Sequence, residues 1–161
     1  MADSDDSFAG GLKSDKLRSV HRIWRGLSAG RIGPARAAIT PAKLRTTVPS
    51  TFMIDVIDGG ADFRFRFAGD RIIQFMGQRY AGRILSELRG TPFFDGMHIL
   101  YSGATTAMKP LSIGPMRANH EGREYLEIEV AVFPLSDDAT SVSGLLGAFD
   151  TWPVGTHTSA R

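Results

Sequence analysis

The chain has 161 residues, of which 42% are hydrophobic and 22% are charged, a balance typical of one soluble globular domain. It contains no cysteine, which excludes disulfides, Cys-ligated zinc, iron–sulfur clusters and thiol catalysis. No apolar run approaches the roughly 20 residues of a membrane-spanning helix. The acidic N-terminus lacks the basic and apolar regions of a secretory signal. We therefore expect a cytoplasmic protein.

The net charge of +2 is unevenly distributed along the chain. Residues 13–45 contain nine Lys or Arg and a single acid, whereas both flanking segments are acidic. Such a basic segment can contact an anionic partner, a membrane surface or nucleic acid. It can equally pair with acidic groups of its own domain. We favour this second interpretation and expect neither nucleic acid nor a membrane as a partner.

The N-terminal third predicts a helical extension in front of the main domain. Residues 1–12 are small and acidic and are expected to be disordered, and residues 13–48 form the extension. Apolar side chains recur at three- and four-residue spacing over residues 14–29, with Lys and Arg on the opposite side. The apolar stripe must be covered by the domain's own sheet, by a second copy of the chain or by a membrane surface. We expect a homodimer, with these interface residues: Leu17, Val20, Trp24 and Leu27.

The main domain is predicted over residues 49–152, beginning with a β-hairpin. Residues 51–57, with Phe52, Ile54 and Val56 on one face, and residues 62–68, which alternate apolar and polar side chains, are predicted strands, and a glycine turn joins them. A short helix follows, with Asp70 as its expected N-cap and Gly77 at its end. Residues 93–103 form a second helix, apolar almost all round and therefore expected to be well buried.

The last third predicts three more strands, and residues 153–161 are expected to be a flexible tail. The strands cover residues 109–116, 124–133 and 141–150. In the middle strand one face is aliphatic, while Glu127 and Glu129 on the other face are expected to be solvated. Two strands, then helices, then three antiparallel strands make an α+β domain with a small apolar cavity between helices and sheet.

This order of elements resembles a PAS domain, and in detail a bacterial single-domain PAS-like subfamily long catalogued as of unknown function. The resemblance covers about residues 17–150. It is carried by Trp24, Gly30-Arg31, Pro34-Ala35-Arg36, Ile39-Thr40-Pro41, Leu44, Pro49, Phe65-Arg66-Phe67-Ala68-Gly69, Gly77, Gly82-Arg83, Leu85 and Leu88. The resemblance implies a five-stranded antiparallel sheet with short helices on one face and an extra N-terminal amphipathic helix. It also implies a cytoplasmic sensory or interaction module that often acts without a fused output domain, and it implies no particular ligand.

Six residues are candidates for contact with a small ligand. Arg66 lies between phenylalanines and could hold an anion through a bidentate pair, or could lie on the outer face of the sheet and pair with Glu127 or Glu129. Four more are expected to line an apolar pocket, or else to be plain core residues: Phe75, Phe94, Tyr101 and Met116. The sixth candidate is His98, which could ligate haem iron or be an ordinary hydrogen-bonded histidine.

Catalytic motifs are not evident in the sequence. The chain has no G-x-S-x-G motif, no phosphate-binding loop and no pair of histidines at metal-ligand spacing. We therefore predict a module that is not an enzyme and that acts through protein–protein interaction, with itself and with an unidentified signalling protein. Gating by a small apolar or anionic ligand is part of this hypothesis. The alternative is a small-molecule-binding protein or enzyme that uses the cavity, with His98 or Tyr101 as its polar group.

Overall fold

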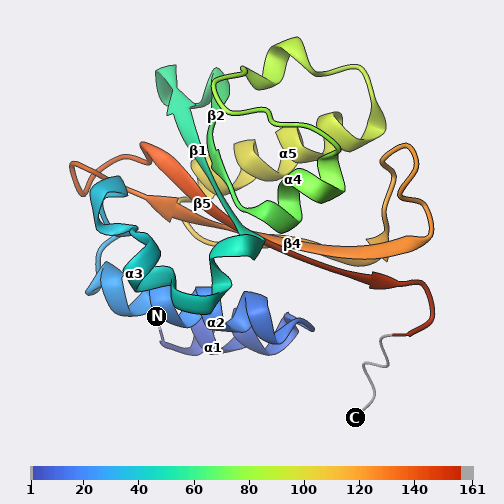
Figure 1. Cartoon of the computed structure of the whole chain (residues 1–161). Coiled ribbons are helices and arrows are strands. Elements are labelled where there is room, and N and C mark those ends of the chain that lie inside the picture. Colours follow the sequence, from blue (N-terminus) through green and yellow to red (C-terminus); the bar gives the residue numbers. More distant parts are fainter. Residues whose placement is uncertain (1, 157–161) are drawn as a thin grey trace.

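A five-stranded antiparallel sheet forms the middle layer of the molecule in the computed structural model, which describes residues 2–156 (Figure 1). The strand order is β2-β1-β5-β4-β3. The strands are β1 Thr51–Ile57, β2 Asp62–Ala68, β3 Leu111–Arg117, β4 Leu126–Leu135 and β5 Gly144–Pro153. Of the two hairpin strands, β1 lies next to β5 and β2 forms an edge of the sheet, and the prediction of an α+β domain with a PAS-like antiparallel sheet is confirmed.

Helices cover both faces of this sheet. One face carries α4 (Asp70–Met76) and α5 (Pro92–Ala107). The opposite face carries α1 (Ala2–Gly11), α2 (Asp15–Ser28) and α3 (Pro41–Leu44), as Figure 1 shows. Short 3-10 turns form most of the remaining connections. Each face of the sheet therefore has its own hydrophobic core.

Strand β4, which lies between β5 and β3, contributes side chains to both hydrophobic cores. Successive side chains on a strand point to opposite faces. Ile128, Val130 and Val132 belong to the core under α4 and α5. Ala131, Phe133 and Leu135 belong to the core under α2. Because both faces are covered, the strand is buried throughout its second half, unlike a strand with one solvated face.

Helix α2 is packed on the chain's own sheet, which corrects the expected dimer interface. Its side chains Leu17 and Val20 are fully buried, and Trp24 is 5% exposed. The Trp24 indole contacts the Phe133 ring, and its Nε1 donates a hydrogen bond to the Pro134 carbonyl over 2.7 Å. Leu27 is half-buried and packs at the edge of the same core. The chain's own sheet covers the apolar stripe, so these side chains do not present a surface to a second copy.

The N-terminus also differs from the prediction, because residues expected to be disordered form helix α1. Two apolar residues near the end of this segment explain why it is ordered. Leu12 is only 1% exposed, and the Phe8 ring packs against the rings of His21 and Phe133. The segment 13–48 is likewise no loose extension, since α2 and α3 help to build the second core.

Element boundaries differ from the predicted ones by a few residues. Gly69, not Asp70, is the N-cap of α4, and a Cβ at Gly69 would lie 2.2 Å from the Val48 carbonyl oxygen. Helix α5 continues to Ala107, and β5 extends to Pro153, into the predicted flexible tail. Residues 157–161 of that tail lie outside the described part of the chain.

The packing of α2 predicts a large cost for truncating Trp24. We expect Trp24→Ala to lower the free energy of unfolding by about 3–5 kcal/mol, because a buried aromatic ring is lost and a cavity remains. Urea denaturation followed by circular dichroism measures this. The exposed Arg22 on the same helix supplies the control, and Arg22→Ala should leave the midpoint nearly unchanged. A Trp24→Ala protein as stable as the wild type would contradict the packing described here.

Candidate functional site

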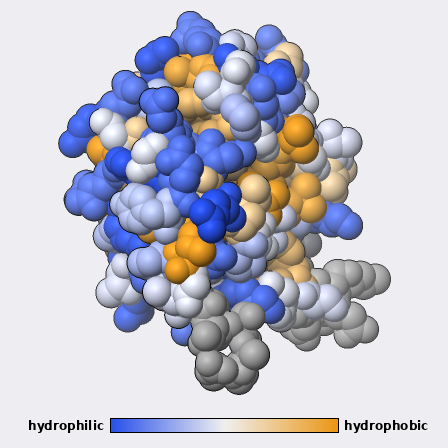
Figure 2. All heavy atoms as spheres, turned by 90° about the vertical axis from the view of Figure 1, so that its right-hand side faces the viewer, coloured by the Kyte–Doolittle hydropathy of each residue, from blue (hydrophilic) through white to orange (hydrophobic). Residues whose placement is uncertain are grey.

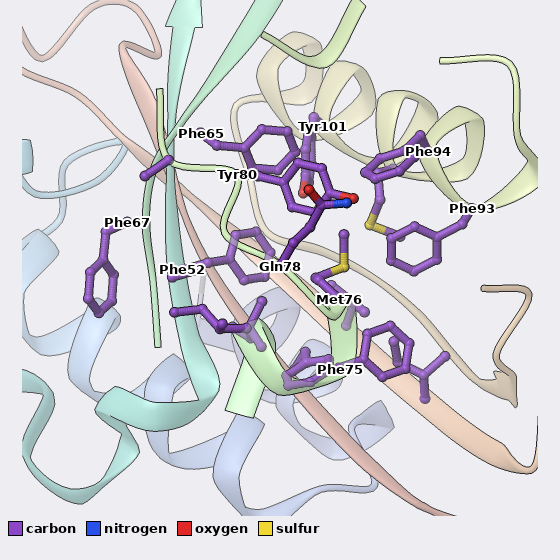
Figure 3. Close-up of a pocket in the computed structure, with 18 residues that line it drawn as sticks. Phe52, Phe65, Phe67, Phe75, Met76, Gln78, Tyr80, Phe93, Phe94 and Tyr101 are labelled. Carbon is purple, nitrogen blue, oxygen red and sulfur yellow. The ribbon is translucent and has the colours of Figure 1, made fainter. Parts of the chain in front are cut away.

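A cavity of about 60 Å³ lies between α4, α5 and the sheet. Its 18 lining residues come from both helices, from four strands and from the connection after α4 (Figure 3). They are Phe52, Phe65, Phe67, Ala68, Ile72, Ile73, Phe75, Met76, Gln78, Tyr80, Ala81, Phe93, Phe94, Met97, Tyr101, Ile128, Val130 and Phe149. The lining is aromatic and aliphatic, with amide and hydroxyl groups as its only polar side-chain groups within residues 2–156.

Three of the predicted ligand residues line this cavity: Phe75, Phe94 and Tyr101. All three also belong to the core and are nearly inaccessible from outside. The two interpretations offered by the sequence, pocket and core, are therefore both correct as descriptions of their position. A ligand contact at these residues stays a prediction.

Arg66 does not reach this cavity. Its Nε donates to both carboxylate oxygens of Asp55, over 3.0 and 3.1 Å, and its side chain is 57% exposed. It lies on the outer side of the sheet, as one of the two interpretations had it, although its partner is neither Glu127 nor Glu129. There it borders a separate surface hollow with Arg36 and Asp137. The expected cation for an anionic ligand is thus absent from the described lining.

His98 also lies outside the lining of the cavity, which overturns its proposed role as a haem ligand. Its ring is half-buried on α5 and meets the Phe63 ring edge-on at 6.1 Å. The volume of the cavity, about 60 Å³, is also far below that of typical ligand pockets, which begin at about 300 Å³. The residues present therefore do not fit a haem group.

Met116 is a surface residue, 41% exposed on strand β3, and does not line the cavity. Other apolar side chains are exposed more strongly, Ile99 to 72% and Tyr125 to 61%. Figure 2 shows one face of the molecule, on which small groups of apolar residues lie among hydrophilic ones. Scattered apolar residues of this kind are normal on protein surfaces and need no ligand to explain them.

The sequence analysis missed several lining residues. Phe93 and Met97 share a helical face with the predicted Phe94 and Tyr101, so the spacing along α5 could have identified them. Tyr80 gave no such signal, because it lies in an irregular connection. The Gly82 amide donates to the Phe65 carbonyl over 2.6 Å, and the Phe65 amide donates to the Arg83 carbonyl over 2.9 Å. These bonds between the connection and β2 hold Tyr80 against the rings of Phe65 and Phe94.

A polar network under α2 was also missed, and Glu129 is its centre. This carboxylate was expected to be solvated but is 1% exposed. Oε2 accepts from the Lys13 amide over 2.9 Å, and Oε1 accepts from the Ser14 amide over 2.8 Å. A buried charge is strongly unfavourable unless it is hydrogen-bonded, so these bonds fix the chain at the start of α2.

Asp150 extends the network from α2 to α4. It is the cross-strand partner of Glu129 in the β4–β5 pairing. Its Oδ2 accepts from the Ser14 hydroxyl over 2.8 Å, and the same hydroxyl caps α2 by accepting from the amides of the next turn. Its Oδ1 accepts from Arg71 over 3.0 Å. Arg71 belongs to α4, the helix that walls the cavity. The wall of the cavity and the start of helix α2 are thus joined through Asp150.

Comparison with known proteins identifies the family of this chain. A family model described as PAS domain matches residues 12–150, so the chain belongs to the PAS domain family. The match begins before α2 and therefore includes the segment that the sequence analysis had set apart as an extension.

Two solved structures of the PAS domain of histidine kinase ThkA are similar to this chain. Each has a TM-score of 0.46 and 16% sequence identity, and the match covers 63% of this chain and 98% of the other. Among curated proteins, no sequence matches this chain.

Over residues 2–156, no helix has the length and apolar character needed to cross a membrane. Across the same part of the chain, no group of three or more His, Asp or Glu side chains is placed to hold a metal ion.

The buried carboxylate of Glu129 leads to a stability prediction. We expect Glu129→Ala to lower the free energy of unfolding by about 1–3 kcal/mol, because the amides of Lys13 and Ser14 lose their acceptor. Glu129→Gln keeps one acceptor oxygen and should cost less. Urea denaturation of both variants is compared with Glu124→Ala, which changes an exposed residue just before the same strand. Equal stability of Glu129→Ala and Glu124→Ala would show that these bonds contribute nothing.

Proposed function

We propose that this PAS domain is a sensory module that binds a small ligand in the cavity and reports it to a partner protein, without catalysing a reaction. The observation that carries the proposal is the hydrogen-bonded link Arg71–Asp150–Ser14, which connects the cavity wall with the start of helix α2. Membership of the PAS family supports a signalling role.

Helix α4 is the element that a ligand would move. Ile72, Phe75 and Met76 of this short helix line the cavity, so a bound molecule would contact them directly. The neighbouring Arg71 does not line the cavity; it donates hydrogen bonds to the Ser50 hydroxyl, over 2.9 Å, and to Asp150. A displacement of α4 therefore changes the geometry of the Arg71–Asp150 ion pair, whose two side chains are only 33% and 15% exposed.

Ser14 connects the hydrogen-bonded link to helix α2. Its hydroxyl both bonds Asp150 and caps α2, while its amide bonds the buried Glu129. Loss of an N-cap typically costs about 1 kcal/mol of helix stability. A ligand that weakens the hydrogen bond between Asp150 and Ser14 would thus loosen the first turn of α2. As in any two-state switch, the ligand shifts the equilibrium only by its difference in affinity for the two states.

The outer face of α2 is the proposed contact surface for the partner. It is basic, with three exposed side chains, Lys16, Arg22 and Arg25, and with the half-buried Arg18, which pairs with Asp15. We propose a signalling protein with an acidic surface as the partner, because opposite charges steer and orient such contacts. A second copy of the chain is the other proposed partner. Because the apolar stripe of α2 is buried, that dimer would form through other, exposed residues, and concentration-dependent light scattering tests for it.

Hydrogen exchange tests the proposed link, with benzene as a probe of the cavity. We expect saturating benzene to change the exchange rates of the Lys13 and Ser14 amides by about fivefold or more, the usual lower range of coupling between sites. In Arg71→Ala the benzene affinity should remain, whereas the change at Lys13 and Ser14 should disappear. NMR spectroscopy measures both quantities in the same titration.

Two controls make this experiment decisive. Arg89→Ala breaks an exposed ion pair with Asp95 outside the Arg71–Asp150–Ser14 link and should leave the coupling intact. Ala68→Leu places a larger side chain in the cavity wall and should abolish benzene binding, while Ala107→Leu, at the exposed end of α5, should not. Benzene binding that leaves the Lys13 and Ser14 amides unchanged in the wild type would refute the signalling link.

A further inference from the structure

The lining of the cavity restricts the charge of its ligand. Within residues 2–156, none of the 18 lining side chains is Lys, Arg, Asp, Glu or His. An ion entering this space would lose its hydration without gaining a partner of opposite charge, which is strongly unfavourable. The ligand that fits the proposed sensory function is therefore neutral.

The size and shape of the cavity restrict the ligand further. A volume of about 60 Å³ offers space for roughly four to six water-sized atoms. Aromatic rings dominate the walls, among them Phe75 and Phe93 at 5.8 Å and Phe93 and Phe94 at 5.3 Å between centroids. Such rings favour a flat ring compound in stacked or edge-on contact.

Tyr101 is the most deeply buried polar group in the lining. It is 2% exposed, and its ring is held between Phe52 and Phe63, at 6.2 and 5.6 Å. Its hydroxyl makes no hydrogen bond to any group of residues 2–156, although its oxygen is not completely enclosed by the chain. Burial raises the pKa of this hydroxyl above its ordinary value, so it stays protonated and can donate.

The other two polar side chains of the lining are less enclosed. Gln78 is exposed and Tyr80 is half-buried, and both belong to the connection after α4. Tyr101 is thus the lining hydroxyl within residues 2–156 whose ring is buried.

We infer that the cavity recognises a small, neutral ring compound through a hydrogen bond from the Tyr101 hydroxyl to an acceptor atom of that compound. This inference rests on the proposed function and gives it a chemical class of ligand. A ring without an acceptor would leave the hydroxyl unpaired, and sites with a buried polar group discriminate strongly against such analogues.

Benzene and pyridine are matched probes for this inference, because the two rings have the same size and differ by one acceptor nitrogen. Their affinities are measured by NMR titration in mildly alkaline buffer, where pyridine is uncharged. The quantity of interest is the ratio of the pyridine affinity to the benzene affinity. We expect Tyr101→Phe to lower this ratio about tenfold, the value of one neutral hydrogen bond at its upper range. Tyr125→Phe, the matched control, removes an exposed hydroxyl outside the cavity and should leave the ratio within about twofold.

The outcomes separate this inference from the proposed function. If both probes bind, Ala68→Leu blocks them, and Tyr101→Phe leaves the ratio unchanged, the role of Tyr101 is refuted while the cavity remains a ligand site. If neither probe binds to the wild type, both proposals fall. Thermal unfolding checks that Tyr101→Phe keeps its fold, as expected for a hydroxyl without a partner in the described chain. A ratio lowered equally by Tyr125→Phe would also refute the inference.

Discussion

A buried carboxylate can be tolerated only if its oxygens are hydrogen-bonded, and this constraint organises one whole face of the molecule. Glu129 lies in strand β4 beneath helix α2, and the amides of Lys13 and Ser14 are its partners. Its burial therefore requires the chain to begin α2 at this point and no other. The apolar stripe of α2 supplies most of the attraction, but it does not select a register along the sheet by itself. The directional hydrogen bonds of Glu129 select the register of α2 along the sheet.

The same region links the two faces of the sheet. Asp150 accepts from Ser14 on one side and from Arg71 on the other, so helix α4, which walls the cavity, and helix α2 share a hydrogen-bonded residue. Polar groups in such a network depend on one another, because losing one bond leaves the others buried and unsatisfied. This dependence is the physical basis for proposing that a molecule in the cavity alters the start of α2.

The cavity itself follows from the shapes of aromatic side chains. Rings from α4, α5 and the sheet cannot fill the space between the layers completely, and the remaining volume is lined without charge. Within residues 2–156, Tyr101 combines a buried ring with a hydroxyl that makes no hydrogen bond to the chain. A core built only for stability would avoid such a group. Its position is therefore the best indication of ligand recognition in the described part of the chain.

The sequence by itself determined the strands, the two main helices and the α+β class, because alternation of period two and spacing of 3.6 residues are local properties of the chain. It also placed Phe75, Phe94 and Tyr101 correctly around a cavity. It could not decide what covers the stripe around Trp24, since a sheet and a second copy offer the same apolar contact. Nor could it distinguish a solvated Glu129 from a buried one, or bring Arg71, Asp150 and Ser14 together. Those outcomes depend on contacts between residues far apart in the chain, which only the tertiary structure decided.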